Sequence, residues 1–226
     1  MRRAQLRPWY AWPVVVIDFE TTGPDPSTCA PVEVGLVRFE RGEPVQRWST
    51  LVNPGEPIPP AATAVHGITD ADVASAPSFT AAWDEVLDLG LLTRAVPCAY
   101  NAPFDRTILH RLTVEDRRCH ALCHDLPWLD PLVVVRHIDR FVRGAGRHRL
   151  AATCARHGVP LLSAHRSVGD AEATGRLLFA LQTQIGDMTI CELLRRQELR
   201  AAEQDRDFAA WQARQPPPPT TGDTTP

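Results

Sequence analysis

Two carboxylates, two residues apart, follow an apolar run near the start of the chain. Asp18 and Glu20 come directly after residues 14–17, Val-Val-Val-Ile, whose composition is that of a strand buried on both faces. Because side chains two positions apart in a strand point to the same face, the two carboxylates are expected side by side. Such a pair repels and is costly to bury, and a divalent cation would make it favourable. Taken alone, the pair is equally compatible with a solvated acidic turn.

Two further acidic residues stand at predicted helix starts. Asp105 follows Asn101-Ala102-Pro103-Phe104 and falls in the first turn of a helix that has proline near its beginning. Asp170 opens another helix, and His165 stands five residues before it. Each has an ordinary alternative, because acidic residues are common in first turns and histidines are common in loops. Their occurrence together, in this order and on these elements, is not easily matched by chance.

The elements that must position these residues alternate between strands and helices, as in an α/β domain with a mixed sheet. Strands are predicted over 14–17, 32–39, 45–52 and 95–100, and a further strand ends at residues 128–130. Residues 57–60, Pro-Ile-Pro-Pro, are predicted to form a rigid loop. Helices are predicted over 79–89, 103–112, 131–141, 150–157, 167–185 and 190–211. Asp130 is interpreted as a structural acceptor or helix cap.

Three segments carry these residues: 16–23 (Val-Ile-Asp-Phe-Glu-Thr-Thr-Gly), 101–105 (Asn-Ala-Pro-Phe-Asp) and 165–171 (His-Arg-Ser-Val-Gly-Asp-Ala). They resemble the motifs of the DEDDh exonucleases, and most closely those of the epsilon-like proofreading exonucleases of bacterial DNA polymerase III. Residues 65–69, 128–132 and 150–159 agree as well, so the resemblance covers about residues 12–183. It implies an RNase H-like fold, with a mixed five-stranded sheet flanked by helices.

The resemblance also implies a role for each catalytic position. Asp18 would bridge two divalent metal ions, Mg²⁺ or Mn²⁺, and Glu20 would bind one of them near the terminal 3′-hydroxyl. Asp105 and Asp170 would complete the metal shells, and His165 would deprotonate the attacking water. Four carboxylates form an oxygen-rich site that suits such ions. Two metals can activate water and stabilise the leaving oxygen.

Four positions are expected to contact the terminal nucleotide by the same resemblance: Phe19, Thr21, His66 and Asn101. His66 has a second interpretation, as a residue that caps a loop. Some positions depart from the family pattern, namely Tyr100 (often His), the pair Ser167-Val168 (often a small residue and Leu) and Ala61 (an acidic contact in some relatives). None of these departures removes a catalytic group, but they leave the nucleotide preference open.

Positive charge is concentrated in the second half of the chain. The formal net charge is −3, yet residues 117–166 hold nine Arg against three Asp. A local basic zone can bind phosphates without making the whole surface cationic, although a solvated helix face is an alternative interpretation. We hypothesise that the Arg-rich residues 136–149 guide a nucleic-acid strand into the site.

The sequence therefore predicts a metal-dependent 3′→5′ exonuclease that releases nucleoside 5′-monophosphates from single-stranded DNA, in proofreading or repair. The alternatives are an RNA-directed exonuclease of the same chemistry and a catalytically silent nucleic-acid-binding module. The motifs do not separate DNA from RNA, because the metals act on the phosphate. A DNA polymerase is a candidate partner, but no clamp-binding peptide is recognised in residues 186–226.

Four segments are expected: an N-terminal extension (1–11), the exonuclease domain (12–185), a helical extension (186–214) and a disordered Pro/Thr tail (215–226). No apolar run reaches the roughly 20 residues that span a bilayer. No signal peptide is recognised, so a cytoplasmic protein without a membrane partner is expected. Residues 119–124 contain two Cys and two His, but a structural zinc site needs a second ligand pair at suitable spacing, and none is evident.

Overall fold

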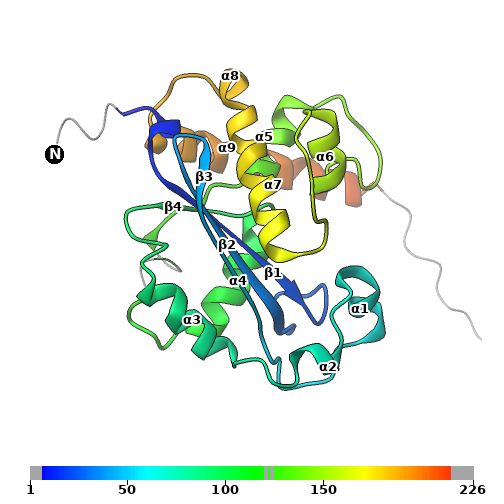
Figure 1. The fold of residues 1–226 in the computed structure, drawn as a ribbon. Coiled ribbons are helices and arrows are strands. Elements are labelled where there is room, and N and C mark those ends of the chain that lie inside the picture. Colours follow the sequence, from blue (N-terminus) through cyan, green and yellow to red (C-terminus); the bar gives the residue numbers. More distant parts are fainter. Residues whose placement is uncertain (1–6, 120–121, 123–124, 215–226) are drawn as a thin grey trace, which may run out of the picture.

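A mixed four-stranded sheet forms the centre of the protein (Figure 1). The computed structural model describes residues 7–119, 122 and 125–214. Its strands are β1 (Val14–Thr21), β2 (Pro31–Glu40), β3 (Glu43–Leu51) and β4 (Val96–Cys98), in the spatial order β3-β2-β1-β4. β1 is antiparallel to β2 and parallel to β4, so the predicted α/β class with a mixed sheet is confirmed. The predicted tail at 215–226, residues 1–6, and both His residues and the second Cys of 119–124 lie outside the described residues.

The prediction of five strands is wrong. The segment expected as the last strand makes only a single parallel bridge, between Leu129 and Cys98 of β4. Leu129 donates to the Pro97 carbonyl at 2.8 Å and accepts from the Ala99 N–H at 3.1 Å. Prolines stand on both sides of this segment, at 127 and 131. Because proline has no N–H to donate, the ladder cannot extend in either direction.

The helices of the described residues are η2 (Trp9–Ala11), α1 (Pro60–His66), α2 (Asp70–Val73), α3 (Phe79–Asp88), α4 (Ala102–Thr113), α5 (Pro131–Ile138), α6 (Leu150–Arg156), α7 (Ser167–Ala180), α8 (Gln182–Ile185) and α9 (Ile190–Gln212). Each predicted helix is present, in order, with some differences in its ends, whereas η2, α1 and α2 were not predicted. The single helix predicted over 167–185 is divided at Leu181, which separates α7 from α8. No helix among the described residues is both long and apolar enough to cross a membrane.

The loop predicted at residues 57–60 ends in a helix that the prediction missed. α1 begins at Pro60, where a proline is well tolerated because the first helical N–H needs no partner. α2 follows with a capping box, in which Thr69 and Asp72 satisfy each other's main-chain N–H groups. The Thr69-x-x-Asp72 spacing could have revealed this second helix.

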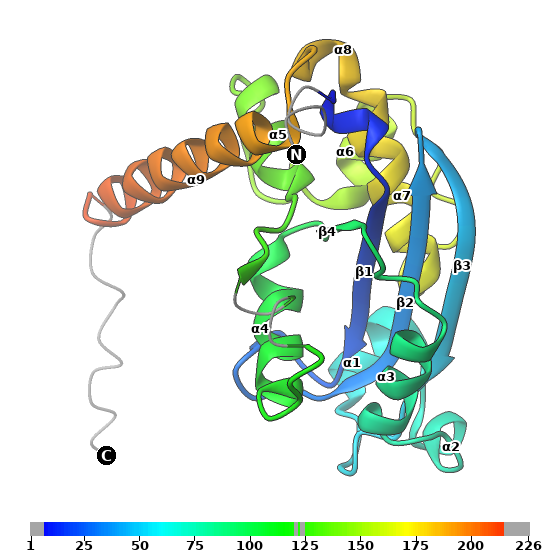
Figure 2. The same ribbon diagram turned by 90° about the vertical axis from the view of Figure 1, so that its left-hand side faces the viewer.

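Helices cover both faces of the sheet (Figure 2). Val15, Ile17 and Phe19 of β1 point to the face that packs against α3 and α4. Val14 and Val16 point to the opposite face, which packs against α5, α6 and α7. By the alternation of strand side chains, Asp18 and Glu20 belong to the α7 face.

The long helix α9 projects from the body of the protein, as Figure 2 shows. Its first turns are anchored by the buried Leu193. Its Gln197 side chain accepts from the Asp130 N–H at 2.7 Å and donates to the Trp128 carbonyl at 2.8 Å. The distal half is solvated, with Phe208 stacked on Trp211 at the surface.

Candidate active site

Three carboxylates from two elements lie together on the α7 face of the sheet. Asp18 and Glu20 project from the end of β1, and Asp170 projects from the first turn of α7. One oxygen of each carboxylate lies within 4.8 Å of the other two. The structure therefore brings together three of the four carboxylates that the sequence singled out.

The close approach of α7 depends on a glycine in the neighbouring strand. Gly35 of β2 is paired with Asp18 of β1. A Cβ at Gly35 would lie 2.4 Å from the main-chain atoms of Ser167 and Val168, at the start of α7. Any larger residue would push this helix away from the sheet, and Asp170 would move with it.

Asp105, the fourth carboxylate, is only 3% exposed in the first turn of α4. It lies outside the three-residue cluster, but its charge reaches Asp18 and helps to raise the pKa of that residue. Its own pKa is raised by burial, against the effect of main-chain hydrogen bonds that include the N–H of Phe19. Asp105 is thus placed beside the cluster by the strand that carries Asp18.

Ionisation of these clustered carboxylates is unfavourable in the folded protein. Burial first, and then the charges of Asp105, Asp170 and Glu20, raise the pKa of Asp18 well above its usual range. Burial and Asp170 also raise the pKa of Glu20 to about 7, although Arg166 opposes the shift. Crowded carboxylates of this kind take up either protons or cations.

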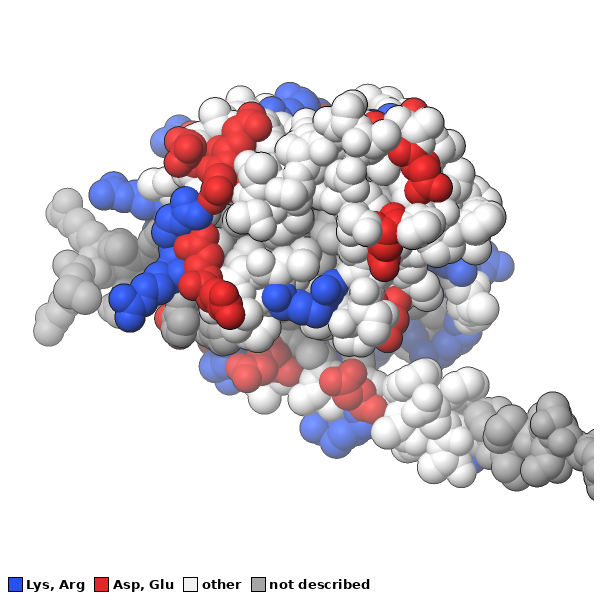
Figure 3. All heavy atoms as spheres, turned by 90° about the horizontal axis from the view of Figure 1, so that it is seen from below, with Lys and Arg blue, Asp and Glu red and all other residues white. Residues whose placement is uncertain are grey.

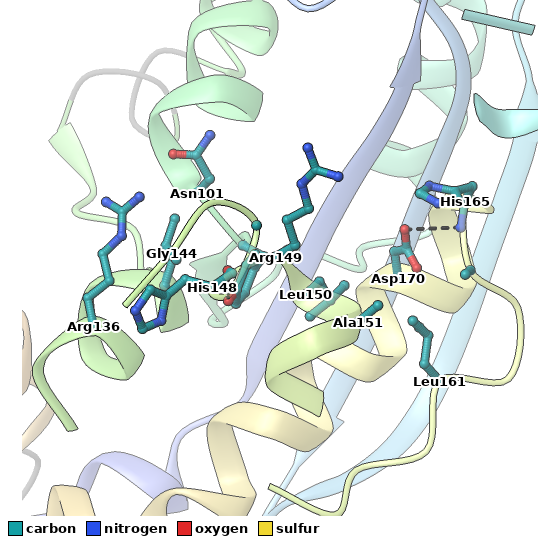
Figure 4. Close-up of a pocket in the computed structure, with 14 residues that line it drawn as sticks. Asn101, Arg136, Gly144, His148, Arg149, Leu150, Ala151, Leu161, His165 and Asp170 are labelled. Atoms are coloured by element: carbon teal, nitrogen blue, oxygen red, sulfur yellow. Dashed lines mark hydrogen bonds between the residues drawn. The ribbon is translucent and has the colours of Figure 1, made fainter. Parts of the chain in front are cut away.

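His165 and Asp170 are joined through the main chain (Figure 4). The His165 N–H donates to Oδ2 of Asp170 at 3.3 Å, and His165 adopts a left-handed backbone conformation with φ of 61°. Its side chain is exposed. The other oxygen of Asp170, Oδ1, is buried and has no hydrogen-bond partner among the described residues. This oxygen is available to a ligand, which an ordinary helix-terminal Asp would not require.

One carboxylate near the site was not singled out from the sequence. Glu33 of β2 is paired with Glu20 of β1 and is 1% exposed. It accepts from the Arg166 guanidinium, whose Nε lies 3.1 Å from Oε1, and from the Ser167 N–H at 2.9 Å. Glu33 therefore fixes the start of α7 while Arg166 balances its charge. The signal was present, since Glu33 is the one charged residue in the apolar run 31–37.

The residues expected at the terminal nucleotide occupy different environments. The ring of Phe19 packs edge-on against Phe79 in the core, so Phe19 offers only its main chain to the acidic cluster. Thr21 donates to the Gly23 carbonyl at 2.8 Å. His66 accepts from the Ile68 N–H at Nδ1, whereas its buried Nε2 has no partner among the described residues. Burial lowers the pKa of His66, and the nearby main chain of Thr21 opposes this shift.

Asn101 is an exposed residue with left-handed geometry (φ 69°, ψ 54°) immediately before α4. Asp130 fixes this turn, because its carboxylate accepts the N–H groups of Asn101 at 3.1 Å and Ala102 at 3.0 Å. The same carboxylate accepts the Leu132 N–H at 2.9 Å and caps α5. The interpretation of Asp130 as a structural acceptor and helix cap is confirmed.

Comparison with protein families shows a match over most of the chain. The model of a family described as Exonuclease matches residues 15–178. The DNA polymerase III subunit epsilon-like protein of Rhodobacter capsulatus is 38% identical over 180 residues, which cover 75% of this chain and 24% of that protein. The PolC-type DNA polymerase III of Thermotoga maritima is 27% identical over 188 residues, covering 82% of this chain and 13% of its own length. The chain thus spans about a quarter or less of these relatives.

Solved structures share the fold. E. coli exonuclease I in complex with a dT13 oligonucleotide aligns with a TM-score of 0.64 at 19% identity, over 76% of this chain and 41% of that one. The nuclease domain of 3′hExo, described as a DEDDh family member bound to rAMP, aligns with a TM-score of 0.64 at 16% identity. That alignment covers 81% of this chain and 97% of the 3′hExo domain.

Proposed function

The chain belongs to the exonuclease family, and we propose that it hydrolyses phosphodiester bonds one at a time from the 3′ end of single-stranded DNA, in a metal-dependent reaction. One observation carries the proposal: Asp18, Glu20 and Asp170 place their oxygens within 4.8 Å of one another, and a buried oxygen of Asp170 lacks a partner among the described residues. Such a cluster has little structural use unless a cation neutralises it.

The residues present fit a divalent metal. Asp18, Glu20 and Asp170 would hold it through carboxylate oxygens, the ligands that Mg²⁺ and Mn²⁺ prefer, with Asp105 beside them for a second ion. When bound, such ions polarise the phosphate and lower the pKa of water. The raised pKa values of Asp18 and Glu20 support this assignment, because they show that the cluster lacks positive charge.

His165 is proposed as the proton acceptor. Its exposed ring stands at the edge of the cluster, next to Asp170. An imidazole nitrogen would take a proton from the attacking water as the water oxygen bonds to phosphorus. The bond from phosphorus to the 3′-oxygen of the preceding nucleotide breaks, and that oxygen takes up a proton. The products are a nucleoside 5′-monophosphate and a strand shortened by one nucleotide with a free 3′-hydroxyl.

The terminal nucleotide is assigned to the side of the cluster formed by the end of β1 and α1. His66 has an unpartnered Nε2 there, and its ring lies close enough to the Thr21 main chain for that contact to affect its pKa. We assign Thr21, His66 and the main chain of Phe19 to contacts with the terminal nucleotide. Asn101 lines a cavity together with His165 and Asp170, so we assign it to the boundary between the terminal nucleotide and the rest of the strand.

DNA is proposed as the substrate because the 38% identical relative is named for DNA polymerase III. A DNA polymerase partner is proposed on the same ground. RNA is the second candidate, because a structural neighbour, the 3′hExo nuclease domain, is described as bound to rAMP.

The test is digestion of 3′- and 5′-labelled DNA and RNA oligonucleotides with Mg²⁺, Mn²⁺ or chelator. The wild type is compared with Asp18→Asn and with Asp88→Asn, an exposed control of the same chemistry. We expect stepwise loss from the 3′ end that requires both metal and Asp18, and faster loss of DNA than of RNA. Binding of oligonucleotide without cleavage under any metal would instead support a silent binding module.

A further inference from the structure

A large cavity begins at the candidate active site and extends away from it (Figure 4). It has a volume of about 690 Å³, within the range of ligand-binding cavities. His165 and Asp170 line one end. Arg136 of α5 and Arg149, just before α6, contribute the basic part of its wall. The cavity therefore connects the site of hydrolysis to two guanidinium groups.

These two arginines differ from most others near the site. Arg166 is paired with Glu33, Arg156 with Asp139, and Arg176 with Glu172. Across the described ranges, neither Arg136 nor Arg149 has a carboxylate within ion-pair distance. The charge of Arg136 does reach the buried Asp130, whose pKa it helps to lower, but without an ion pair. Two guanidinium groups without an ion pair in one cavity are the expected complement of an anion such as a phosphodiester.

The segment that carries Arg149 is fixed in place. Tyr100, two residues after the end of β4, donates its hydroxyl to the His148 carbonyl at 2.6 Å. This hydroxyl also lies 3.0 Å from Thr153 Oγ1. Burial raises the pKa of Tyr100 to about 12, so the hydroxyl keeps its proton. His148 Nε2 lies 3.2 Å from the Val142 carbonyl and braces the same loop from within. Arg149 is thus positioned relative to the sheet, unlike an arginine on an unanchored loop.

The face of the protein seen from below shows no broad basic area. Figure 3 shows small acidic and basic groups, some of them in contact with one another, around a broad area that is mostly uncharged. The net charge of the chain is −3. Attraction for a polyanion must therefore come from local features such as this cavity wall.

We propose that Arg136 and Arg149 bind phosphodiester groups of the strand on the 5′ side of the bond to be cut, and that Tyr100 is a positioning residue for Arg149. This inference rests on the proposed function, which assigns the terminal nucleotide to the side of the cluster near His66, at the end of β1. The strand would then cross the acidic cluster and continue along the cavity. It follows that a substrate must extend at least one nucleotide beyond the scissile phosphate to bind tightly.

Two substrates separate this role from the chemistry. The 4-nitrophenyl ester of thymidine 5′-monophosphate contains the scissile phosphate but no upstream strand, whereas a dT10 oligonucleotide contains both. For Arg136→Gln with Arg149→Gln, we expect kcat/KM on dT10 to fall at least about tenfold more than kcat/KM on the ester. We also expect the dependence of log Kd on log salt to become shallower by roughly 0.7 for each lost phosphate contact. Arg94→Gln is the matched control. Arg94 is an exposed arginine that precedes β4, whereas Tyr100 and the cavity lie beyond the other end of this strand.

An equal fall on both substrates, or no fall on dT10, overturns the inference. A binding experiment separates failure of this inference from failure of the proposed function. Binding of fluorescent dT10 and rU10 is measured in the Asp18→Asn variant, in which no cleavage is expected. If the slope of log Kd against log salt is the same with and without the Arg136 and Arg149 substitutions, the inference is contradicted, whichever substrate the enzyme cleaves. A shallower slope for both oligonucleotides indicates recognition of the shared phosphate chemistry, and a change for one alone identifies which strand the cavity selects.

Discussion

Gly35 lies opposite Asp18 in the β1–β2 ladder, and a Cβ on Gly35 would lie 2.4 Å from the main chain that begins α7. A residue without a side chain in one strand therefore determines how close the helix with Asp170 comes to the strand with Asp18. This one position therefore affects both the geometry of the candidate metal site and the packing of the core.

The first prediction concerns Gly35→Ala. The new methyl group must displace α7, and we expect the free energy of unfolding to fall by about 1–3 kcal/mol in urea titrations. Mn²⁺ binding, measured by calorimetry on the folded protein, should weaken as well. Gly23→Ala is the control for stability, because a Cβ there meets its nearest neighbour at 3.9 Å. Unchanged stability and Mn²⁺ affinity in Gly35→Ala would show that α7 does not depend on this contact.

The second prediction concerns pH. The pKa of Glu20 is raised by burial from 4.5 to about 7, and that of Asp18 is raised by burial and neighbouring carboxylates. The folded protein thus retains protons that the unfolded chain has lost, so the metal-free protein should lose stability as pH rises from about 4.5 to 7. Glu172 titrates below this window, because its hydrogen bond with Arg47 lowers its pKa to about 2, whereas the lowered pKa of His66 acts in the opposite direction within the window.

Bound metal should reverse this trend, since a cation favours the ionised carboxylates. Thermal unfolding between pH 4.5 and 7, with chelator or with excess Mn²⁺, is the measurement. The double variant Asp18→Asn with Glu20→Gln should show a smaller pH dependence and a smaller Mn²⁺ effect. A pH dependence in chelator that is the same in the wild type and in the double variant would contradict the prediction.

The third prediction concerns Asp130→Asn. The carboxylate accepts three main-chain N–H groups, and an amide offers only one oxygen in its place. At least one buried N–H loses its acceptor, so we expect a loss of about 1–3 kcal/mol in the free energy of unfolding. The exposed Asp88→Asn should stay within about 0.5 kcal/mol of the wild type. Equal stability of the two variants in urea would mean that the turn at Asn101 is held by other contacts.

The fourth prediction concerns Tyr100→Phe, which removes the hydroxyl bond to the His148 carbonyl. We expect a loss of about 1 kcal/mol in stability. We also expect KM for dT10 to rise about threefold or more, with little change in kcat for the nitrophenyl ester. Tyr10→Phe is a matched control, because Tyr10 also donates a hydroxyl, to Asp187, but is not near the cavity. A KM for dT10 that is unchanged in Tyr100→Phe would remove Tyr100 from the positioning role.

The sequence predicted the elements that carry the candidate site because short-range rules define them. The apolar run before Asp18 marks β1, proline in the first turn marks α4, and spacing from His165 to Asp170 marks the start of α7. Each signal lies within a few residues of the side chain that it positions.

Features that depend on pairing between distant segments could not be read in this way. Gly35 and Glu33 gain their roles from the register of β2 against β1 and from the docking of α7, which no local pattern specifies. The prediction of a fifth strand was wrong because Pro127 and Pro131 prevent a ladder from extending. The pairing in the structure shows that a single bridge, between Leu129 and Cys98, remains. Residues 136–149 were interpreted as a single basic stretch, whereas the structure selects Arg136 and Arg149 for the cavity wall.

The contact between Gln197 and the segment beside β4 has a consequence for self-association. The N–H of Asp130 and the carbonyl of Trp128 face away from β4, where a further strand would pair with them, and the Gln197 amide occupies both. An unpaired sheet edge is a template for strands of other molecules. A single side chain of α9 therefore shields this edge against intermolecular β-pairing, and losing the helix would expose a surface prone to aggregation.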